Sequence, residues 1–131
     1  MKYGFTKTTD YSFEQAIEKV TEELKKEGFG VLTTIDVKDT LKKKIDVDFK
    51  KYTILGACNP KLAHSALQVE EELGLLLPCN VIVYEKKDKT VISIFDPRVM
   101  TIVIENPEMK PVAEEVKTKL QRVLEAVYGL S

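Results

Sequence analysis

Two stretches of the chain repeat apolar side chains at helical spacing. The first contains five apolar residues three or four positions apart: Phe13, Ala16, Ile17, Val20 and Leu24. Ser12 and Gln15 fit a capping box, in which each side chain satisfies a backbone N–H group at the helix start, and Gly28 suits the left-handed position after the helix end. The second stretch follows Asn106-Pro107, closes at Gly129 and carries six apolar residues: Val112, Val116, Leu120, Val123, Leu124 and Val127. Both stretches predict amphipathic helices.

Five stretches rich in β-branched and aromatic residues predict strands: residues 2–8, 29–37, 52–58, 80–85 and 90–95. The charged residues 86–89 make the last two strands a hairpin. Asn59-Pro60 combines a good N-cap with a residue suited to the first helical position, which predicts a short helix ending near Gly74. Residues 38–45 predict a short amphipathic turn, and Asp96-Pro97 begins a loop or a single helical turn.

This order of elements favours an α+β protein with a mainly antiparallel sheet and helices on one face. No linker rich in Ser, Gly or Pro divides the chain, so residues 1–131 are expected to form a single domain. The second face of the sheet must be wet or covered by a partner. Five apolar strand residues suggest a partner there: Val31, Ile82, Val83, Ile92 and Ile94.

Composition narrows the possible functions. With 131 residues, 44% hydrophobic and 31% charged, the chain has an ordinary globular balance, and its net charge of −1 excludes a bulk basic field for nucleic-acid binding. The N-terminus shows no signal peptide and no apolar run is long enough to span a membrane, so a cytoplasmic protein without membrane contact is expected. The five tyrosines and five phenylalanines are expected mainly in the core, and they do not interleave with a basic stripe.

Two motifs carry a resemblance to a known family. The segments Gly56-Ala57-Cys58-Asn59-Pro60 and Leu77-Pro78-Cys79-Asn80-Val81, with Asp96-Pro97 further on, resemble the domain of unknown function 302 family over nearly the whole chain. The resemblance implies a TBP-like two-layer fold, β-α-β(4)-α, here with short extra helices, and a homodimer. The family has no established activity, so the resemblance supplies no reaction.

The two cysteines are the main candidates for chemistry. Cys58 closes a strand just before a helix, Cys79 opens the next strand, and each is followed by an asparagine. In an antiparallel sheet, which the resemblance implies, both thiols come to the same edge. Free backbone N–H groups at the helix start favour a thiolate, which predicts Cys58 as the more reactive thiol. Asn59, Asn80 and Asp96 are further ligand-binding candidates, although both asparagines equally suit cap and turn roles.

His64, the only histidine, lies in the first turns of the helix after Cys58. Two thiolates and this imidazole would supply three ligands to zinc or copper, with water, Asp96 or a substrate in the fourth position. The spacing is a weaker signal than a paired CxxC motif, and free cysteines are often simply buried.

Three functions therefore stay open. The first is a homodimer that binds a small ligand or metal ion, zinc among them, at the Cys58/Cys79 edge. The second is a thiol- or persulfide-handling protein with Cys58 as nucleophile. The third is a structural or interaction module whose cysteines only pack. The sequence does not decide between binding and catalysis.

Overall fold

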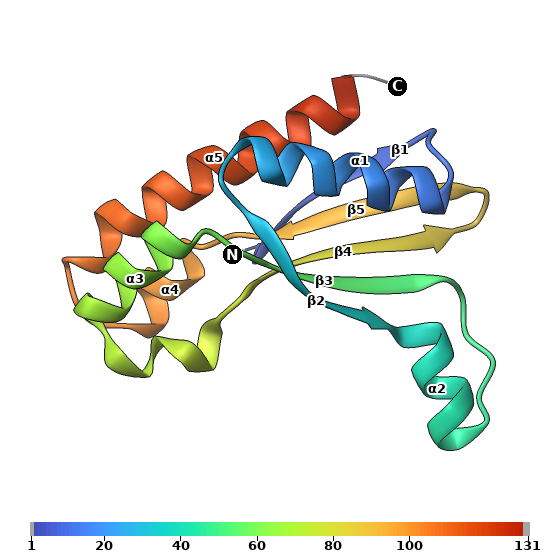
Figure 1. Cartoon of the computed structure of the whole chain (residues 1–131), viewed down its shortest axis with the longest axis horizontal. Coiled ribbons are helices and arrows are strands. Elements are labelled where there is room, and N and C mark those ends of the chain that lie inside the picture. The colour runs from blue at the N-terminus through green and yellow to red at the C-terminus, as the bar shows by residue number, and fades with distance from the viewer. Residues whose placement is uncertain (1, 130–131) are drawn as a thin grey trace.

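The computed structural model describes residues 2–129, and five strands in this part of the chain form one antiparallel sheet (Figure 1). The strands are β1 (Gly4–Thr9), β2 (Gly30–Asp36), β3 (Tyr52–Cys58), β4 (Cys79–Lys86) and β5 (Lys89–Phe95). Their order across the sheet is β1-β5-β4-β3-β2, so the first and second strands form the two edges. The predicted hairpin is confirmed as β4 and β5, which pair from Lys86 opposite Lys89.

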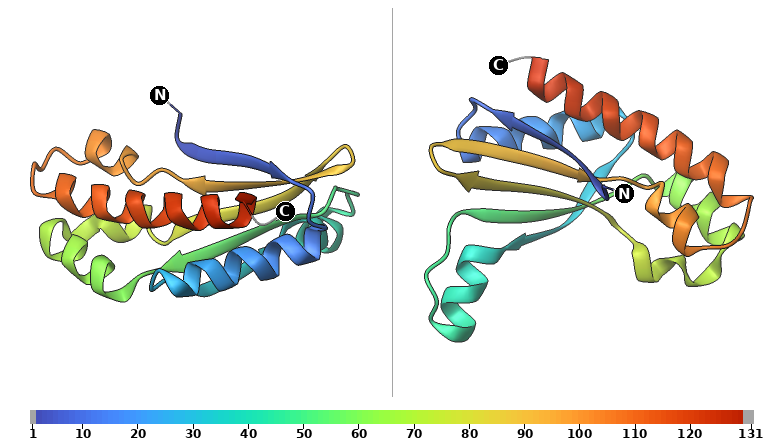
Figure 2. Two further views of the ribbon diagram at one scale, coloured as in Figure 1. Left: turned by 90° about the horizontal axis from the view of Figure 1, so that it is seen from above. Right: turned by 180° about the vertical axis from the view of Figure 1, so that it is seen from behind.

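Two long helices cover one face of this sheet. They are α1 (Phe13–Lys26) and α5 (Met109–Gly129), which pack against each other (Figures 1 and 2). The capping box predicted for α1 is confirmed: Ser12 Oγ accepts a hydrogen bond from the Gln15 backbone N–H at 3.1 Å, and Gln15 Oε1 accepts one from the Ser12 N–H at 3.1 Å. Gly28 adopts the left-handed conformation after the helix, with φ of 87°.

The main core lies between this face of the sheet and the two long helices. Its fully buried side chains come from both layers: Val20, Leu24, Leu55, Val81, Val83, Ile92, Ile94, Leu120, Val123 and Val127. The order β1-α1-β2-β3-β4-β5-α5, with short helices inserted, is the expected β-α-β(4)-α arrangement of an α+β two-layer fold. Among residues 2–129, no helix combines the length and apolar character needed to cross a bilayer.

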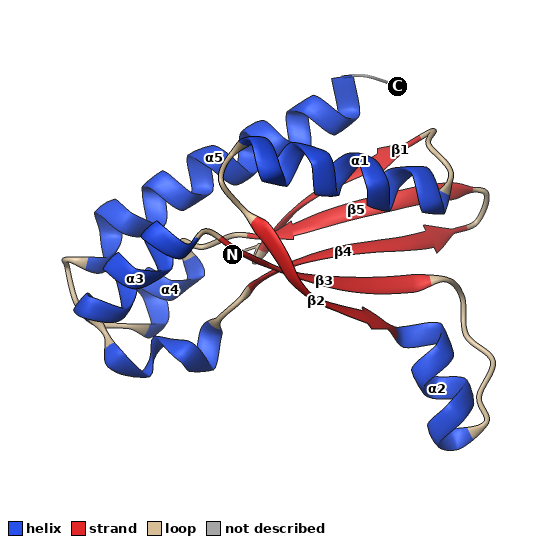
Figure 3. Ribbon diagram, in the orientation of Figure 1, coloured by secondary structure: helices blue, strands red, loops and turns tan. Residues whose placement is uncertain are grey.

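Three short helical segments surround the first half of α5 (Figure 3). They are α3 (Pro60–Val69), the 3₁₀ helix η1 (Glu71–Leu76) and α4 (Val99–Val103). Asn59 caps α3 as predicted, since its Oδ1 accepts the Leu62 N–H at 3.3 Å. The helix ends at Val69 rather than near Gly74, because the chain tightens into η1. A second, smaller core joins these segments to the start of α5.

The helix α2 (Val37–Ile45) stands apart from the body on the β2–β3 side (Figure 1). None of its residues is buried. The chain that returns from it to β3 is exposed over residues 46–50 and leaves apolar side chains in water, with Val47 at 42% and Phe49 at 38% exposure. We refer to residues 37–50 as the arm.

The expectation about the second sheet face is largely wrong. Val83, Ile92 and Ile94 are fully buried beneath the helices, and Val31 packs against the same core. Side chains alternate between the two faces of a strand, so the register directs these residues to the helices. Of the five residues expected on the second face, Ile82 and the otherwise buried Ile94 are among those that line its hollow. This helix-free side is called the open face below.

Candidate functional site

The sheet brings the two cysteines together, as expected for antiparallel strands. Cys79 pairs with Ala57, the residue before Cys58, at the end of the β3–β4 ladder. Both cysteines line one small pocket of about 30 Å³ beneath α3 and α5. Its other lining residues are almost all apolar, and Leu62 and Val116 are examples from those two helices. The volume corresponds to about one or two water molecules, and an apolar pocket of this size holds little for water to bind.

The two thiols differ in their surroundings. Cys79 is 6% exposed, whereas Cys58 is half-buried. Burial, and secondarily repulsion from Cys58, raises the pKa of the Cys79 thiol from 9.0 to about 11. Cys79 therefore stays protonated at neutral pH and is a poor nucleophile, because the thiolate is the reactive form.

The predicted metal ligands are not gathered. His64 is exposed on α3, and its Nε2 lies 3.4 Å from the side-chain nitrogen of Gln68. Within residues 2–129, no group of three His, Cys, Asp or Glu side chains is placed to hold a metal ion. The structure thus brings Cys58 and Cys79 to one pocket without adding His64 to them.

The Asn59 side chain forms hydrogen bonds with the backbone. Beyond its cap on α3, its Nδ2 donates to the Glu27 carbonyl oxygen at 3.3 Å, so both ends of the amide are occupied. Asn80 is different, because it is exposed and lies on the open face.

The Asp96 carboxylate is also held by hydrogen bonds within the fold. It is 2% exposed, and Arg98 donates to both carboxylate oxygens, at 2.8 Å from Nη2 to Oδ2 and 3.1 Å from Nε to Oδ1. Burial opposes ionisation, but the hydrogen bonds and charge of Arg98, helped by Lys117, outweigh it and hold the pKa of Asp96 below 3.8. This carboxylate holds Arg98 in place and is not presented to a ligand.

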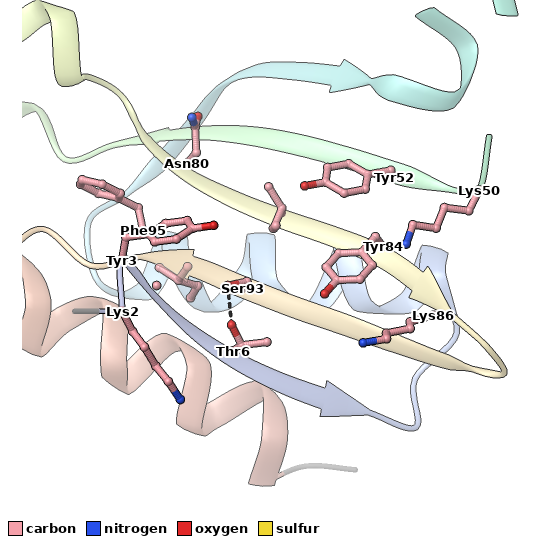
Figure 4. A pocket seen from close by; sticks show the side chains of 13 residues that line it. Lys2, Tyr3, Thr6, Lys50, Tyr52, Asn80, Tyr84, Lys86, Ser93 and Phe95 are labelled. Atoms are coloured by element: carbon pink, nitrogen blue, oxygen red, sulfur yellow. Dashed lines mark hydrogen bonds between the residues drawn. The ribbon is translucent and has the colours of Figure 1, made fainter. Parts of the chain in front are cut away.

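The open face contains a larger concavity, which we call the hollow. Its volume is about 770 Å³, within the range of small-molecule sites. Its lining comes from four strands and the segments before β1 and β3: Lys2, Tyr3, Gly4, Thr6, Lys50, Tyr52, Asn80, Ile82, Tyr84, Lys86, Ser93, Ile94 and Phe95 (Figure 4). Ile82 lies in a row of cross-strand neighbours with Ile54 and Ile35, and this row gives the face an apolar stripe.

Aromatic rings stand at both ends of the hollow (Figure 4). Tyr52 and Tyr84 are cross-strand partners whose rings stack with centroids 5.3 Å apart and planes at 14°. Tyr3 and Phe95 stand at the opposite end, with the Tyr3 and Tyr52 hydroxyls turned toward the space between. Burial, followed by the neighbouring Tyr84 and Tyr3 phenols, raises the pKa of Tyr52 above 10.0. At neutral pH the Tyr52 hydroxyl is therefore protonated and can donate a hydrogen bond.

These tyrosines correct the expectation that the aromatic residues are mainly core and separate from basic residues. Tyr3 is 78% exposed, and Tyr52 and Tyr84 are half-buried on the open face. Lys50 lies over Tyr84, with Nζ 4.8 Å from the ring centroid. The sequence did contain a signal for this aromatic and basic surface, because residues 50, 52 and 54, and residues 80, 82, 84 and 86, lie at alternate positions and therefore share a face. Only strand pairing brings the two segments together.

The charged side chains that line the hollow all carry a positive charge. Three lysines line it, and no carboxylate from residues 2–129 does. Lys51 makes the contrast clear, because it turns to the other side and binds Glu14 of α1 at 2.8 Å. In the described chain, neither Lys50 nor Lys86 forms an ion pair with a carboxylate.

The architecture and site define a class of small two-layer α+β proteins with one open sheet face. The sequence profile of the domain of unknown function DUF302 matches residues 5–127, and the chain belongs to this family. An uncharacterized conserved DUF302 protein from Bacillus stearothermophilus has a similar crystal structure, with a TM-score of 0.89 and 30% sequence identity over 95% of this chain and 98% of that one. No functionally curated protein matches the sequence.

Proposed function

We propose that the protein binds a small molecule in the hollow of the open face. The observation that carries this proposal is the lining: an apolar floor at Ile82, aromatic walls and a few convergent polar groups. Small-molecule sites combine these features, since apolar contact supplies affinity and a few polar groups fix orientation. The hollow of about 770 Å³ can admit such a molecule, whereas the cysteine pocket of about 30 Å³ cannot.

The lining favours binding over catalysis. Among residues 2–129, no carboxylate, imidazole or thiol side chain faces the hollow. These groups are the most frequent general acids, bases and nucleophiles of enzymes. Of the ligand-binding candidates at the cysteine edge, Asn80 alone belongs to the hollow. The proposal therefore keeps the ligand-binding hypothesis and moves its site from the cysteine edge to the open face.

A second copy of the chain is a less suitable occupant. In a two-fold symmetric dimer the same patch meets itself, so a face-to-face pair would bring the three lysines of each lining, Lys2, Lys50 and Lys86, into one interface whose lining has no carboxylate from residues 2–129. Like charges that meet without a counter-ion are unfavourable. The face is also concave, and two concave surfaces leave a void between them.

The cysteine pocket supports a packing role for its thiols. Cys79 is buried, stays protonated, and is surrounded by apolar side chains. These properties are those of a small hydrophobic residue. They give the thiol-transfer and metal-binding hypotheses little support, and the proposed function does not require either cysteine.

The test uses a fluorescent probe and a variant that fills the hollow. The chain has no tryptophan, and three of its five tyrosines line the hollow, so a bound naphthalene probe should quench tyrosine emission. Replacing Ser93, which is half-buried on the open face, by Phe should weaken probe binding at least tenfold. The matched control is Ser65→Phe, at an exposed position on α3 away from the hollow.

Circular dichroism and thermal unfolding would verify that both variants fold. Equal binding by the wild type, Ser93→Phe and Ser65→Phe would refute the proposal. So would a wild-type dimer that Ser93→Phe converts to a monomer in light scattering, because the occupant would then be a second copy.

A further inference from the structure

The charge pattern at one end of the hollow identifies the chemistry of its ligand. Tyr52 and Tyr84 are directly opposite, and pairing continues one residue further, where the Glu85 N–H donates to the Lys51 carbonyl oxygen at 3.0 Å. Lys50, in the segment before β3, and Lys86, at the end of β4, occupy the next positions beyond this pairing. These lysines are therefore neighbours across the two segments, and both line the hollow at the end formed by Tyr52 and Tyr84 (Figure 4).

Like charges at opposed positions destabilise a sheet unless an anion lies between them. The protein supplies no such anion, because no carboxylate from residues 2–129 lines the hollow or forms an ion pair with Lys50 or Lys86. Two nearby lysines that point elsewhere do have partners: Lys51 binds Glu14 and Lys89 binds Asp10 at 2.6 Å. Lys50 and Lys86 thus place two positive charges at one end of the hollow with no carboxylate of the described residues in its lining, even though the net charge of the chain is only −1.

We infer that the hollow binds a planar aromatic anion, with its anionic group at Lys50 and Lys86 and its rings over Ile82 toward Tyr3. This inference rests on the proposed function and adds the class of ligand. Carboxylate, sulfonate and phosphate groups share the required chemistry, since each accepts hydrogen bonds from ammonium and phenol donors. The Tyr52 and Tyr84 hydroxyls are further donors in the lining of the hollow.

The dimensions of the face agree with a molecule of two fused or linked rings. From Tyr84 to Asn80 the strand spans four residues, or about 13 Å at 3.3 Å per residue. Over this length the floor is apolar at Ile82 and the far end is walled by Tyr3 and Phe95. A flat ring system can contact these aromatic side chains edge-to-face or by stacking.

Two probes separate charge from shape. Anilinonaphthalene sulfonate carries an anionic group, and N-phenyl-1-naphthylamine has the same rings without it. We expect the anionic probe to bind about tenfold more tightly at low salt, and this advantage to shrink as salt screens the lysines. Tyrosine quenching reports both probes.

Single lysine substitutions locate the anionic group. Lys50→Ala and Lys86→Ala should each weaken the sulfonate probe about fivefold, the effect of one charge at contact distance in a water-exposed site. Neither should change binding of the neutral probe. Lys51→Ala is the matched control, because this lysine neighbours Lys50 in sequence but is paired with Glu14 on the other side.

The outcomes distinguish the two proposals. If both probes bind equally and are displaced equally by Ser93→Phe, the hollow binds ligands but the inference of an anion is wrong. If neither probe binds, or if Ser93→Phe displaces neither, the proposed function itself is wrong. If Lys51→Ala weakens the sulfonate probe as much as Lys50→Ala, the attraction comes from the general charge of the protein, and the inferred anion site is refuted.

Discussion

Raising the pH from 7 to 10 should destabilise the fold through one buried thiol, Cys79. In the folded protein its pKa is raised from 9.0 to about 11, first by burial and then by repulsion from Cys58. In the unfolded chain, water restores the ordinary value. Between the two values the unfolded chain has lost a proton that the folded chain keeps, so stability is fully present below pH 9 and falls as the pH rises through 11.

The size of this effect follows from the shift in pKa. A difference of two pH units corresponds to about 2.7 kcal/mol of unfolding free energy once the thiol is ionised in both states. At pH 10 about half of it, roughly 1.4 kcal/mol, should already be lost. That is large beside the 5–15 kcal/mol typical of a domain.

Urea unfolding at pH 7 and pH 10, followed by far-ultraviolet circular dichroism, measures the loss. Cys79→Ala should show about 1.4 kcal/mol less pH-dependent destabilisation than the wild type, whatever its stability at pH 7. Cys58→Ala is the control, because it retains the buried thiol and the larger cause of its shift. Tyrosines and lysines that titrate in this range are common to all three proteins, so their contribution cancels.

Two results would refute this reasoning. One is an equal loss of stability in all three proteins. It would mean that the pKa of Cys79 is the same in the folded and the unfolded chain. The other is rapid alkylation of Cys79 by iodoacetamide at pH 7 without denaturant. Either result would return thiol chemistry to consideration for this edge of the sheet.

Three further predictions concern packing, acid stability and assembly. Gly56→Ala should lower the free energy of unfolding in urea by about 1–3 kcal/mol, because the new Cβ would collide with Thr33. The control Gly30→Ala should change it little, since nothing lies within 4 Å of a Cβ at that position. Equal effects of the two variants would show that the crowding at Gly56 is absent. Asp96→Asn should lower the free energy of unfolding by about 1–3 kcal/mol at pH 7. Since the folded pKa of Asp96 lies below 3.8, this difference from the wild type should fade as the pH falls below that value. A difference that stays constant with pH would contradict the lowered pKa of Asp96. The homodimer stays a prediction, for which light scattering should give twice the 14.9 kDa of one chain, and the mass of a single chain would refute it.

The fold was largely predictable because its signals are local. The capping box at Ser12 and the helical stripe of α1 depend on residues within one or two turns, and the β4–β5 hairpin depends on its charged turn. The 3₁₀ helix η1 was missed because its sequence, which includes the 84% exposed Leu75, has no distinct periodicity. Alternation also shows which residues share a face without showing which face is covered. In the first half of β5 burial does not follow this alternation, since the consecutive residues Val91 and Ile92 are both buried.

The site was much less predictable, because its residues meet only through the register of the sheet. Tyr52 and Tyr84 belong to different strands, Lys50 precedes β3 and Lys86 ends β4, so nothing in the chain between them indicates that they are neighbours. The cysteines attracted the functional hypotheses because each lies in a distinctive local motif. Distinctive motifs can equally mark crowded turns and caps, as the two hydrogen bonds of Asn59 illustrate.

The isolation of the arm has a consequence for how the protein fluctuates. Helix α2 contributes no buried side chain, so unfolding it exposes almost no apolar surface of the core. Its amides should exchange with deuterium long before those of β4 and β5, and its three consecutive lysines, residues 42–44, should be the first place that trypsin cuts. A chain nicked there would stay assembled, because β2 and β3 on either side of the cut remain paired in the sheet.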